Sequence, residues 1–291
     1  TALGSLKAGR MDWDWGLGSG FDLVGNDLIA GLANGATVKL AYFEKTQNGW
    51  NKKEVDAGSM DEHVSVVAVG KDNRKVAYVY STASTPPQYR VAELDEGRRS
   101  VSLPEGEELF DLNKHLDKKT IARTEVVRWT GAMDDEINGI LYYPHNYQEG
   151  RAYPLVVTIH GGPAGVDTDS WNESWTDFNN IMAQKGAFVL MPNYHGSGNH
   201  GQEFVESIKG HYYEYEVPDV ISGIDMLVDK GMVDRDSLGV KGWSNGAIIT
   251  TKLTIEYPDL FKVAAPGAGD VNWTSDYGTC RFGVSFDQSY F

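Results

Sequence analysis

Residues 237–257 contain a strand-like run, a glycine-flanked turn and a helix-like run in direct succession, and they read SLGVKGWSNGAIITTKLTIEY. The apolar residues of 237–241 predict a short strand, and residues 247–257 predict a helix that stops before Pro258. The turn between them, residues 242–246, has the form G-x-S-x-G. In this strand–turn–helix context the form is typical of a nucleophile elbow.

Ser244 stands at the centre of that turn. A nucleophile elbow holds its serine in a strained turn that lifts the hydroxyl above the sheet. Glycine on either side leaves room for the turn and for the incoming helix. We therefore predict that Ser244 is a catalytic nucleophile. The alternative is a glycine- and serine-rich strand-to-helix turn that carries no reaction.

A second motif, residues 160–163 (HGGP), directly follows the apolar run 155–159. Small residues after a central strand allow backbone N–H groups to approach a substrate oxygen, and α/β-hydrolases usually place one oxyanion donor here. The other donor comes from the residue after the nucleophile. We therefore expect the N–H groups of Gly162 and Asn245 to form an oxyanion hole. We interpret His160 as structural, because the general base of this fold follows the nucleophile in chain order.

A third motif is the glycine-rich loop of residues 193–201 (NYHGSGNHG), which holds His195 and His200. Two histidines five residues apart suggest a metal site, but no cysteine and no close carboxylate pair completes a ligand set. We therefore predict no metal and no cofactor. A loop that lines the mouth of an active site fits the pattern better.

The N-terminal part of the chain is rich in short strand-like runs and lacks a sustained helical period. Turn signals such as Asn34-Gly35 and Asn48-Gly49 separate these runs, which indicates a sandwich or about two to three blades of a β-propeller. The predicted strands are residues 27–33, 37–44, 64–70, 75–81 and 88–94. A polar linker at 113–120 ends this part.

After the linker, strands alternate with helices, which indicates an α/β fold with a parallel sheet. Residues 125–130 and 137–143 predict a hairpin, and residues 217–230 carry apolar side chains at helical spacing. The other predicted strands are residues 155–159, 187–191 and 262–265.

These motifs, in this order and spacing, resemble the catalytic domain of the prolyl oligopeptidase family of serine peptidases. Within this family, the motifs most resemble those of the acylaminoacyl-peptidase-like and dipeptidyl-peptidase-like branch. Residues 139–144 (GILYYP) and 153–157 (YPLVV) add to the resemblance, which runs from about residue 137 to residue 291. The family loop usually has arginine where His195 stands.

The resemblance implies an α/β-hydrolase domain over residues 118–291, preceded over residues 1–117 by the last blades of a β-propeller. It also implies that Trp273 and Tyr277 wall the pocket for the residue before the scissile bond. Aromatic faces suit a proline ring or another compact apolar side chain; the alternative is ordinary aromatic packing. The expected partner is a short peptide substrate.

The triad of this fold runs serine, then an acid, then histidine, but none of the seven histidines follows Ser244. We therefore expect the triad Asp and His beyond residue 291, in a chain truncated at both ends, with little activity in these 291 residues alone. A catalytically inert binding module is the alternative. An esterase is another, because the same constellation hydrolyses esters.

The composition of the chain excludes several classes of function and structure. The chain has 26 Lys and Arg against 41 Asp and Glu, a formal net charge of −15, which makes a nucleic-acid partner improbable. No run of about 18 apolar residues occurs, so we expect no membrane span in this chain. Cys280 is the one cysteine and cannot form an internal disulfide. Compartment and oligomeric state leave no readable signal in the sequence.

Overall fold

The chain forms two compact units, each described here by itself. The computed structural model describes residues 16–71, 74–174, 177–281 and 283–290. The first unit, called the β unit, comprises Thr1–Lys119 and Asp169–Trp171. The second, called the α/β unit, comprises Thr120–Thr168 and Asn172–Phe291.

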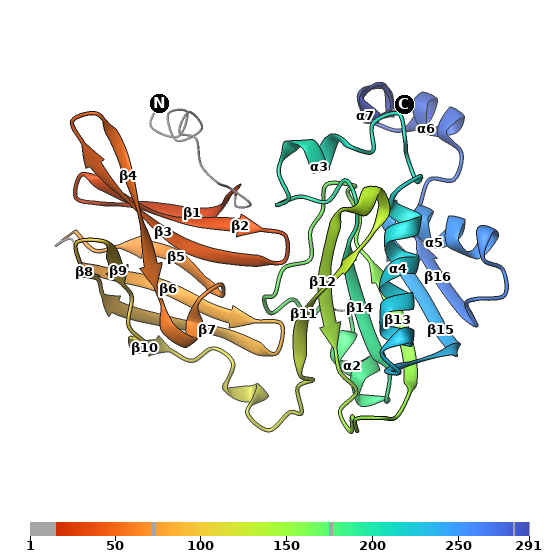
Figure 1. The fold of residues 1–291 in the computed structure, drawn as a ribbon, viewed down its shortest axis with the longest axis horizontal. Coiled ribbons are helices and arrows are strands. Elements are labelled where there is room, and N and C mark those ends of the chain that lie inside the picture. Colours follow the sequence, from red (N-terminus) through yellow and green to blue (C-terminus); the bar gives the residue numbers. More distant parts are fainter. Residues whose placement is uncertain (1–15, 72–73, 175–176, 282, 291) are drawn as a thin grey trace. The chain divides into compact units, whose positions relative to one another are not determined.

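The β unit contains two four-stranded antiparallel arrangements that resemble propeller blades (Figure 1). One has the order β1-β2-β3-β4, to which the short strands β9 and β8 are added, and the other has the order β10-β7-β6-β5. The strands are β1 (Gly16–Val24), β2 (Asp27–Asn34), β3 (Thr37–Thr46), β4 (Gly49–Asp56), β5 (Val64–Val69), β6 (Lys75–Thr82), β7 (Thr85–Glu93), β8 (Asp95–Glu96), β9 (Ser100–Ser102) and β10 (Glu107–Phe110).

Two-residue turns join the first four strands, and the predicted signals Asn34-Gly35 and Asn48-Gly49 lie at the second and third of these turns. The sequence did not predict the strands β1 and β4. Asn34 pairs with Thr37 across the β2–β3 turn, where Gly35 has φ +50°. Such turns need positive φ, which glycine adopts without steric cost. Ile29, Tyr42 and Tyr78 are among the buried side chains of the core shared by the two sheets.

The α/β unit is built on a six-stranded sheet with the order β11-β12-β14-β13-β15-β16. β11, β12 and β14 pair antiparallel, and the pairs from β14 through β13 and β15 to β16 are parallel. The strands are β11 (Thr124–Thr130), β12 (Glu136–Tyr142), β13 (Tyr153–Ile159), β14 (Phe188–Asn193), β15 (Val233–Trp243) and β16 (Val263–Gly267). The prediction of an α/β-hydrolase-type fold after a propeller-like region is confirmed.

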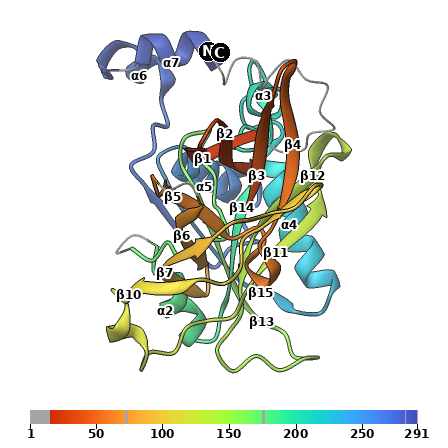
Figure 2. The same ribbon diagram turned by 90° about the vertical axis from the view of Figure 1, so that its left-hand side faces the viewer.

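Helices cover the two faces of this sheet unequally. Ile224 and Leu227 of α4 and Ile249 of α5 pack on Leu155 and Val240, so α4 and α5 share one face. α2 packs against β14 and β12 from the other face, where Asn179 contacts Met191. The helices are α2 (Asn179–Gln184), α3 (Gln202–Glu206), α4 (Glu216–Asp229), α5 (Asn245–Glu256), α6 (Trp273–Thr279) and α7 (Gly283–Tyr290). Figure 2 shows α6 and α7 side by side.

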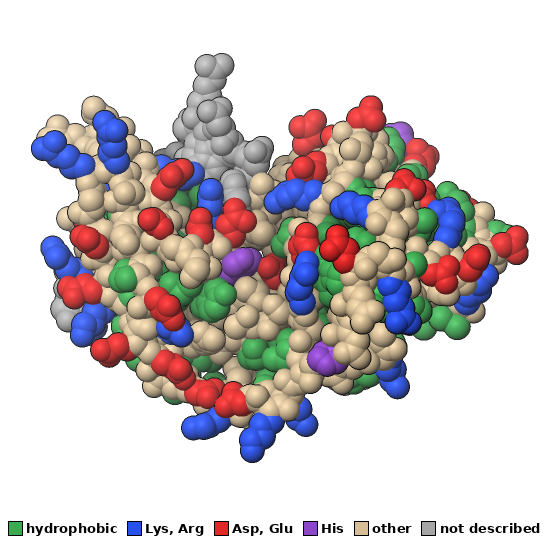
Figure 3. All heavy atoms as spheres, turned by 60° about the horizontal axis from the view of Figure 1, so that its bottom comes forward, with side chains coloured by type: hydrophobic (Ala, Val, Ile, Leu, Met, Phe, Trp, Pro, Cys, Tyr) green, Lys and Arg blue, Asp and Glu red, His purple; other side chains and the backbone are tan. Residues whose placement is uncertain are grey.

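The surface carries charges of both signs. On the face drawn in Figure 3, Asp and Glu side chains are interspersed with Lys and Arg, and no single basic patch stands out. Within the described ranges, no helix is both long enough and apolar enough to cross a membrane.

Candidate active site

Ser244 lies at the junction of β15 and α5 with a strained backbone. Its φ is 54° and its ψ is −121°, a region that residues with a side chain seldom adopt. Its backbone N–H donates to the carbonyl oxygen of Gly267 in β16, at 2.9 Å, which supports the turn. The residue is exposed at the end of the parallel sheet. This is the geometry of a nucleophile elbow.

The two glycines of the elbow are required by close backbone contacts. A Cβ atom added to Gly246 would lie 2.1 Å from the carbonyl oxygen of Ile159, and one added to Gly242 would lie 2.2 Å from that of Gly246. Both distances are well inside van der Waals contact. Glycine at these positions therefore lets α5 begin directly against the end of β13.

The loop of residues 160–163 lies against Ser244. A Cβ atom added to Gly161 would be only 3.1 Å from the Cβ atom of Ser244. Gly162 has φ +138°, which only glycine adopts readily. Asn245 is the first residue of α5, so its N–H has no acceptor within the helix. The structure thus brings both predicted oxyanion segments to Ser244.

His160 is partly buried, and its ring contacts groups other than Ser244. Its Nδ1–H donates to the carbonyl oxygen of Gly161 at 2.8 Å, so its Nε2 accepts from the Ser197 hydroxyl at 2.9 Å. Its ring stacks on Tyr194, with ring centres 4.4 Å apart. Burial lowers the pKa of His160 to about 4, and the ring is neutral at neutral pH. This geometry agrees with a structural role.

The side chain of Asn245 is held by three tyrosines. Its Oδ1 accepts from the hydroxyls of Tyr212 at 3.0 Å and Tyr213 at 3.3 Å, and its Nδ2 donates to the Tyr194 hydroxyl at 3.2 Å. The Tyr194 hydroxyl in turn donates to the carbonyl oxygen of His160 at 2.8 Å. Sequence reasoning did not find these tyrosines, because Tyr212 and Tyr213 lie more than 30 residues before Asn245.

The glycine-rich loop of residues 193–201 supports the loop of residues 160–165. Gly198 N–H donates to the carbonyl oxygen of Gly165 at 3.0 Å, in addition to the contacts of Tyr194 and Ser197 with His160. Within the described ranges, no group of three or more His, Cys, Asp or Glu side chains is suited to hold a metal ion.

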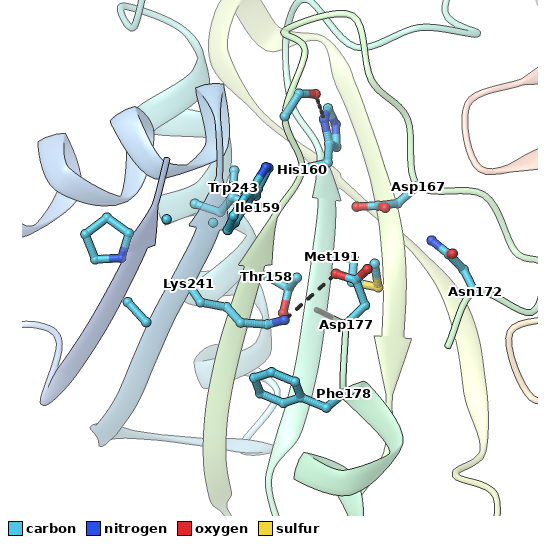
Figure 4. Close-up of a pocket in the computed structure, with 15 residues that line it drawn as sticks. Thr158, Ile159, His160, Asp167, Asn172, Asp177, Phe178, Met191, Lys241 and Trp243 are labelled. Carbon is cyan, nitrogen blue, oxygen red and sulfur yellow. Dashed lines mark hydrogen bonds and ion pairs between the residues drawn. The ribbon is translucent and has the colours of Figure 1, made fainter. Parts of the chain in front are cut away.

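A cavity of about 550 Å³ adjoins the elbow on the sheet face opposite α4 and α5. Its lining includes His160 and Trp243 beside the nucleophile. Lys241 and Asp177 point toward one another within it, with Nζ and Oδ1 3.9 Å apart (Figure 4). Burial raises the pKa of Asp167 to about 7, so this carboxyl group is partly protonated at neutral pH.

Comparison with known proteins finds a family match within the α/β unit. Residues 174–289, which include the elbow and most of the two helices that follow β16, match the family model of the prolyl oligopeptidase family. Over these residues the chain is similar to that family. An uncharacterized peptidase of Bacillus subtilis, YuxL, is 26% identical over 275 residues, which are 91% of this chain and 40% of that protein.

Another relative is similar in sequence over part of the chain, and two solved structures are similar in fold. Acylamino-acid-releasing enzyme 1 of Oryza sativa subsp. japonica is 31% identical over 120 residues, which are 41% of this chain and 15% of that protein. An acylaminoacyl peptidase of Pyrococcus horikoshii has the same fold, with a TM-score of 0.72 at 21% identity over 96% of this chain and 41% of that chain. A puromycin-hydrolyzing peptidase of Mycobacterium tuberculosis has a TM-score of 0.72 at 21% identity, over 96% of this chain and 42% of that chain. The chain thus spans less than half the length of these proteins.

Trp273 and Tyr277 both lie on α6. Trp273 stacks on Phe286 of α7, with ring centres 6.1 Å apart, and meets the edge of Tyr212 at 5.8 Å. Tyr212 is one of the tyrosines that hydrogen-bond to Asn245. The side chain of Tyr212 therefore lies between Trp273 and the elbow. Tyr277 is 47% exposed.

Four histidines of the α/β unit form ring hydrogen bonds with groups other than Ser244. All seven histidines of the chain precede Ser244 in the sequence. The ring nitrogens with hydrogen-bond partners belong to His160, His195, His200 and His211, and their partners are Gly161, Ser197, Asp219, Asp135, Asn138, Gly198 and Glu214. None of these hydrogen bonds reaches the nucleophile.

Proposed function

We propose that this protein is a serine peptidase that hydrolyses short peptides through an acyl-enzyme on Ser244. The observation that carries the proposal is the strained elbow at Ser244, packed directly against the loop of residues 160–163. The family match and the names of the relatives support the same reaction class.

In the proposed reaction, Ser244 Oγ bonds to the carbonyl carbon of the peptide. The N–H groups of Gly162 and Asn245 donate hydrogen bonds to the oxyanion that forms, and the amine leaves with a proton. Water then hydrolyses the ester to free Ser244 Oγ. The tyrosines around Asn245 keep the start of α5 in place while charge develops.

The general base is the part of the machinery that residues 1–291 do not supply in this proposal. An unactivated serine hydroxyl is a weak nucleophile, and loss of a triad member costs several orders of magnitude in rate. No histidine follows Ser244, and the histidine contacts described above lie elsewhere. We therefore place the triad Asp and His in further chain, and we expect little turnover from the 291 residues alone.

For the substrate, we propose that Trp273 and Tyr277 wall the pocket for the residue before the scissile bond. The exposed ring of Tyr277 is available for contact, and Trp273 continues the aromatic surface toward Tyr212. Flat aromatic faces favour a compact apolar side chain.

The test uses fluorophosphonate labelling and peptide hydrolysis by the chain extended to the length of its relatives. Ser244→Ala should abolish both signals, because the attacking oxygen is removed. Ser289→Ala is the matched control, since this exposed serine lies on α7 and bonds only within its helix. Unchanged turnover in the Ser244→Ala protein would contradict the proposal that Ser244 is the nucleophile.

Two other functions use the same observations. An esterase would hydrolyse the ester of a short acyl substrate but not the matching amide, so the ratio of the two rates separates it from a peptidase. An inert binding module is favoured only by the absence of a histidine after Ser244. It predicts that the extended protein binds a peptide without labelling by a fluorophosphonate.

A further inference from the structure

His195 is buried between two carboxylates that come from different parts of the α/β unit. Its Nδ1 lies 2.7 Å from Oδ2 of Asp219 in α4, and its Nε2 lies 3.2 Å from Oδ2 of Asp135 in the β11–β12 turn. The same Asp219 oxygen accepts the backbone N–H of His195 at 2.8 Å. The side chains of His195 and Asp219 are both 0% exposed.

This geometry favours a proton on each ring nitrogen. A neutral imidazole has one nitrogen that only accepts, and here that nitrogen would face a carboxylate oxygen. The imidazolium form donates at both ends instead. Burial alone would lower the pKa of His195, but the hydrogen bonds and charges of Asp219 and Asp135 outweigh it and raise the pKa above its ordinary value.

The other titratable groups that surround His195 do not supply a positive charge in place of the imidazolium. Phe204 lies between the rings of His195 and His200, with ring centres 4.5 Å apart on each side. His200 accepts from Asn138 and donates to Gly198, and burial lowers its pKa, so it stays neutral. The Tyr215 ring faces His195 at 5.5 Å from the start of α4.

Two further charges lie at the edge of this group. Arg128 and Glu136, on β11 and β12, form an ion pair with Nη1 and Oε1 2.8 Å apart, and they influence His200 rather than His195. The charge state between α4 and the β11–β12 turn therefore depends on His195 itself.

The neighbours of His195 in sequence are the residues that hold the candidate oxyanion loop. Tyr194 bonds to the carbonyl oxygen of His160, Ser197 bonds to the His160 ring, and Gly198 bonds to the carbonyl oxygen of Gly165. At most three positions in the chain therefore separate His195 from the residues that hydrogen-bond to residues 160–165.

Asp219 also connects this region to the sheet. Its Oδ1 accepts from Ala132 N–H at 2.8 Å, and its carbonyl oxygen accepts from Trp129 Nε1 at 3.0 Å. The carboxylate therefore stays fixed by α4 and by the β11–β12 turn, whatever the state of the imidazole. The movable partner is the loop that carries His195.

We propose that His195, Asp219 and Asp135 form a protonation-dependent anchor for residues 193–198, and that loss of the imidazole proton loosens the loop that supports residues 160–165. His195 is then a positioning residue that acts through Tyr194 and Ser197. The effect on the loop does not depend on catalysis; its effect on the oxyanion hole rests on the proposed function.

The direction of the pH effect follows from linkage. A histidine whose pKa is raised by folding contributes stability that is fully present below its unfolded pKa, near 6.5, and is lost as pH rises through the folded value. Mildly acidic solution should keep the anchor closed, and alkaline solution should release it.

The first test is a titration of the intact 291-residue chain by NMR of its histidine rings. The His195 resonance, assigned by its loss in His195→Gln, should titrate above the ordinary histidine range. Asp135→Asn should lower the midpoint, because it removes an exposed carboxylate without emptying a buried site. A midpoint at or below the ordinary value, or one unmoved in Asp135→Asn, would overturn the proposal.

The second test follows the loop by amide hydrogen exchange over about pH 6 to about pH 9.5, corrected for intrinsic rates. Protection of residues 160–166 and 193–198 should fall across the His195 midpoint in the wild type. In His195→Arg, whose charge is permanent, that fall should disappear.

Thermal unfolding measures how much the charged His195 stabilises the fold, and a second histidine variant serves as the control. The unfolding temperature of His195→Gln should be about 2–6 °C below the wild type at acidic pH, and the gap should close at alkaline pH. His211→Gln removes an exposed histidine–carboxylate pair and should show no such pattern. If His195→Arg does not fold, the hydrogen-exchange profile of the wild type and the NMR titration of Asp135→Asn still test the proposal. Constant protection across a measured His195 midpoint would refute the loop coupling.

Discussion

Asn245 serves the candidate site with two different parts of one residue. Its backbone N–H stands at the first position of α5, beside Ser244, while its side chain bonds to three tyrosine hydroxyls. The amide suits this setting because it accepts through one atom and donates through the other. A carboxylate of the same shape could not donate to Tyr194.

Gly246→Ala tests the close contact between the elbow and β13. The new Cβ atom would lie 2.1 Å from the carbonyl oxygen of Ile159 and 2.6 Å from that of His160, and neither backbone atom can move freely. We expect a loss of about 2–4 kcal/mol in the free energy of unfolding, measured by chemical denaturation.

Gly278→Ala is the matched control for that substitution. Gly278 lies in α6, and an added Cβ atom there meets nothing within 4 Å. Alanine favours helix over glycine by about 0.5–1 kcal/mol, so this variant should be neutral or slightly more stable. Equal losses in the two variants would contradict the steric account.

For single residues, the sequence predicts which of them meet at the candidate site when they are close together in the chain. It does not predict contacts between residues that are far apart in the chain. Ser244 and Asn245 share one motif, and the small residues 160–163 follow an obvious strand. His195 and Asp219 are 24 residues apart, and no local pattern joins them. One signal was available: Glu216 and Asp219 occupy the same helical face as Val220 and Ile224, which is the buried face.

Helix α4 begins with a buried carboxyl group, and this sets its response to pH. Glu216 is 0% exposed, and burial raises its pKa from 4.5 to about 7, despite the opposing effect of nearby backbone N–H groups. A carboxyl group whose pKa is raised by folding stabilises the fold below its unfolded pKa. That contribution is lost as pH rises through the folded value.

Glu216→Gln should therefore be more stable than the wild type at about pH 8.5 by about 2–4 kcal/mol, and the gain should shrink at about pH 5. Denaturant unfolding at the two pH values measures this difference. Glu214→Gln is the control, because that side chain is 62% exposed. A gain of the same size at both pH values would show that burial of charge is not the cause.

The elements themselves were predictable to different degrees. The continuous apolar runs of β13 and β14 and the helical period of α4 are strong local signals, and the structure contains all three. α6 and α7 are only seven and eight residues long and rich in Ser, Thr, Gly and Asp, so their helical state depends on packing. Phe286 and Tyr290 supply that packing through their contacts with Trp273 and Tyr212.

On the scale of the whole chain, the β unit is not made of one continuous segment. Asp169–Trp171 belong to it, although they lie between residues of the α/β unit. Asp169 Oδ1 accepts from Ala83 N–H at 2.7 Å, its N–H donates to the carbonyl oxygen of Ala36 at 2.6 Å, and Trp171 N–H donates to Ser81. The sequence contains no signal for this return of the chain.

Asp169→Ala should weaken the β unit, because Ala83 N–H loses a charged acceptor in a partly buried place. The expected cost is about 1–3 kcal/mol, seen as faster amide hydrogen exchange in residues 81–85. Asp61→Ala, at an exposed turn, is the control and should leave that segment unchanged. Unchanged exchange in the Asp169→Ala chain would mean that the segment contributes nothing to the β unit.

The hydrogen bond from Ser244 to Gly267 ties the turn at Ser244 to β16, the last strand in the order of the six-stranded sheet. Val263, on that strand, is 68% exposed, so little apolar burial holds it in place. An edge strand frays at a lower free energy than the strands inside the sheet. Contacts that hold β16 in place therefore also stabilise the turn at Ser244, so the position of the Ser244 hydroxyl depends on the stability of this edge of the sheet.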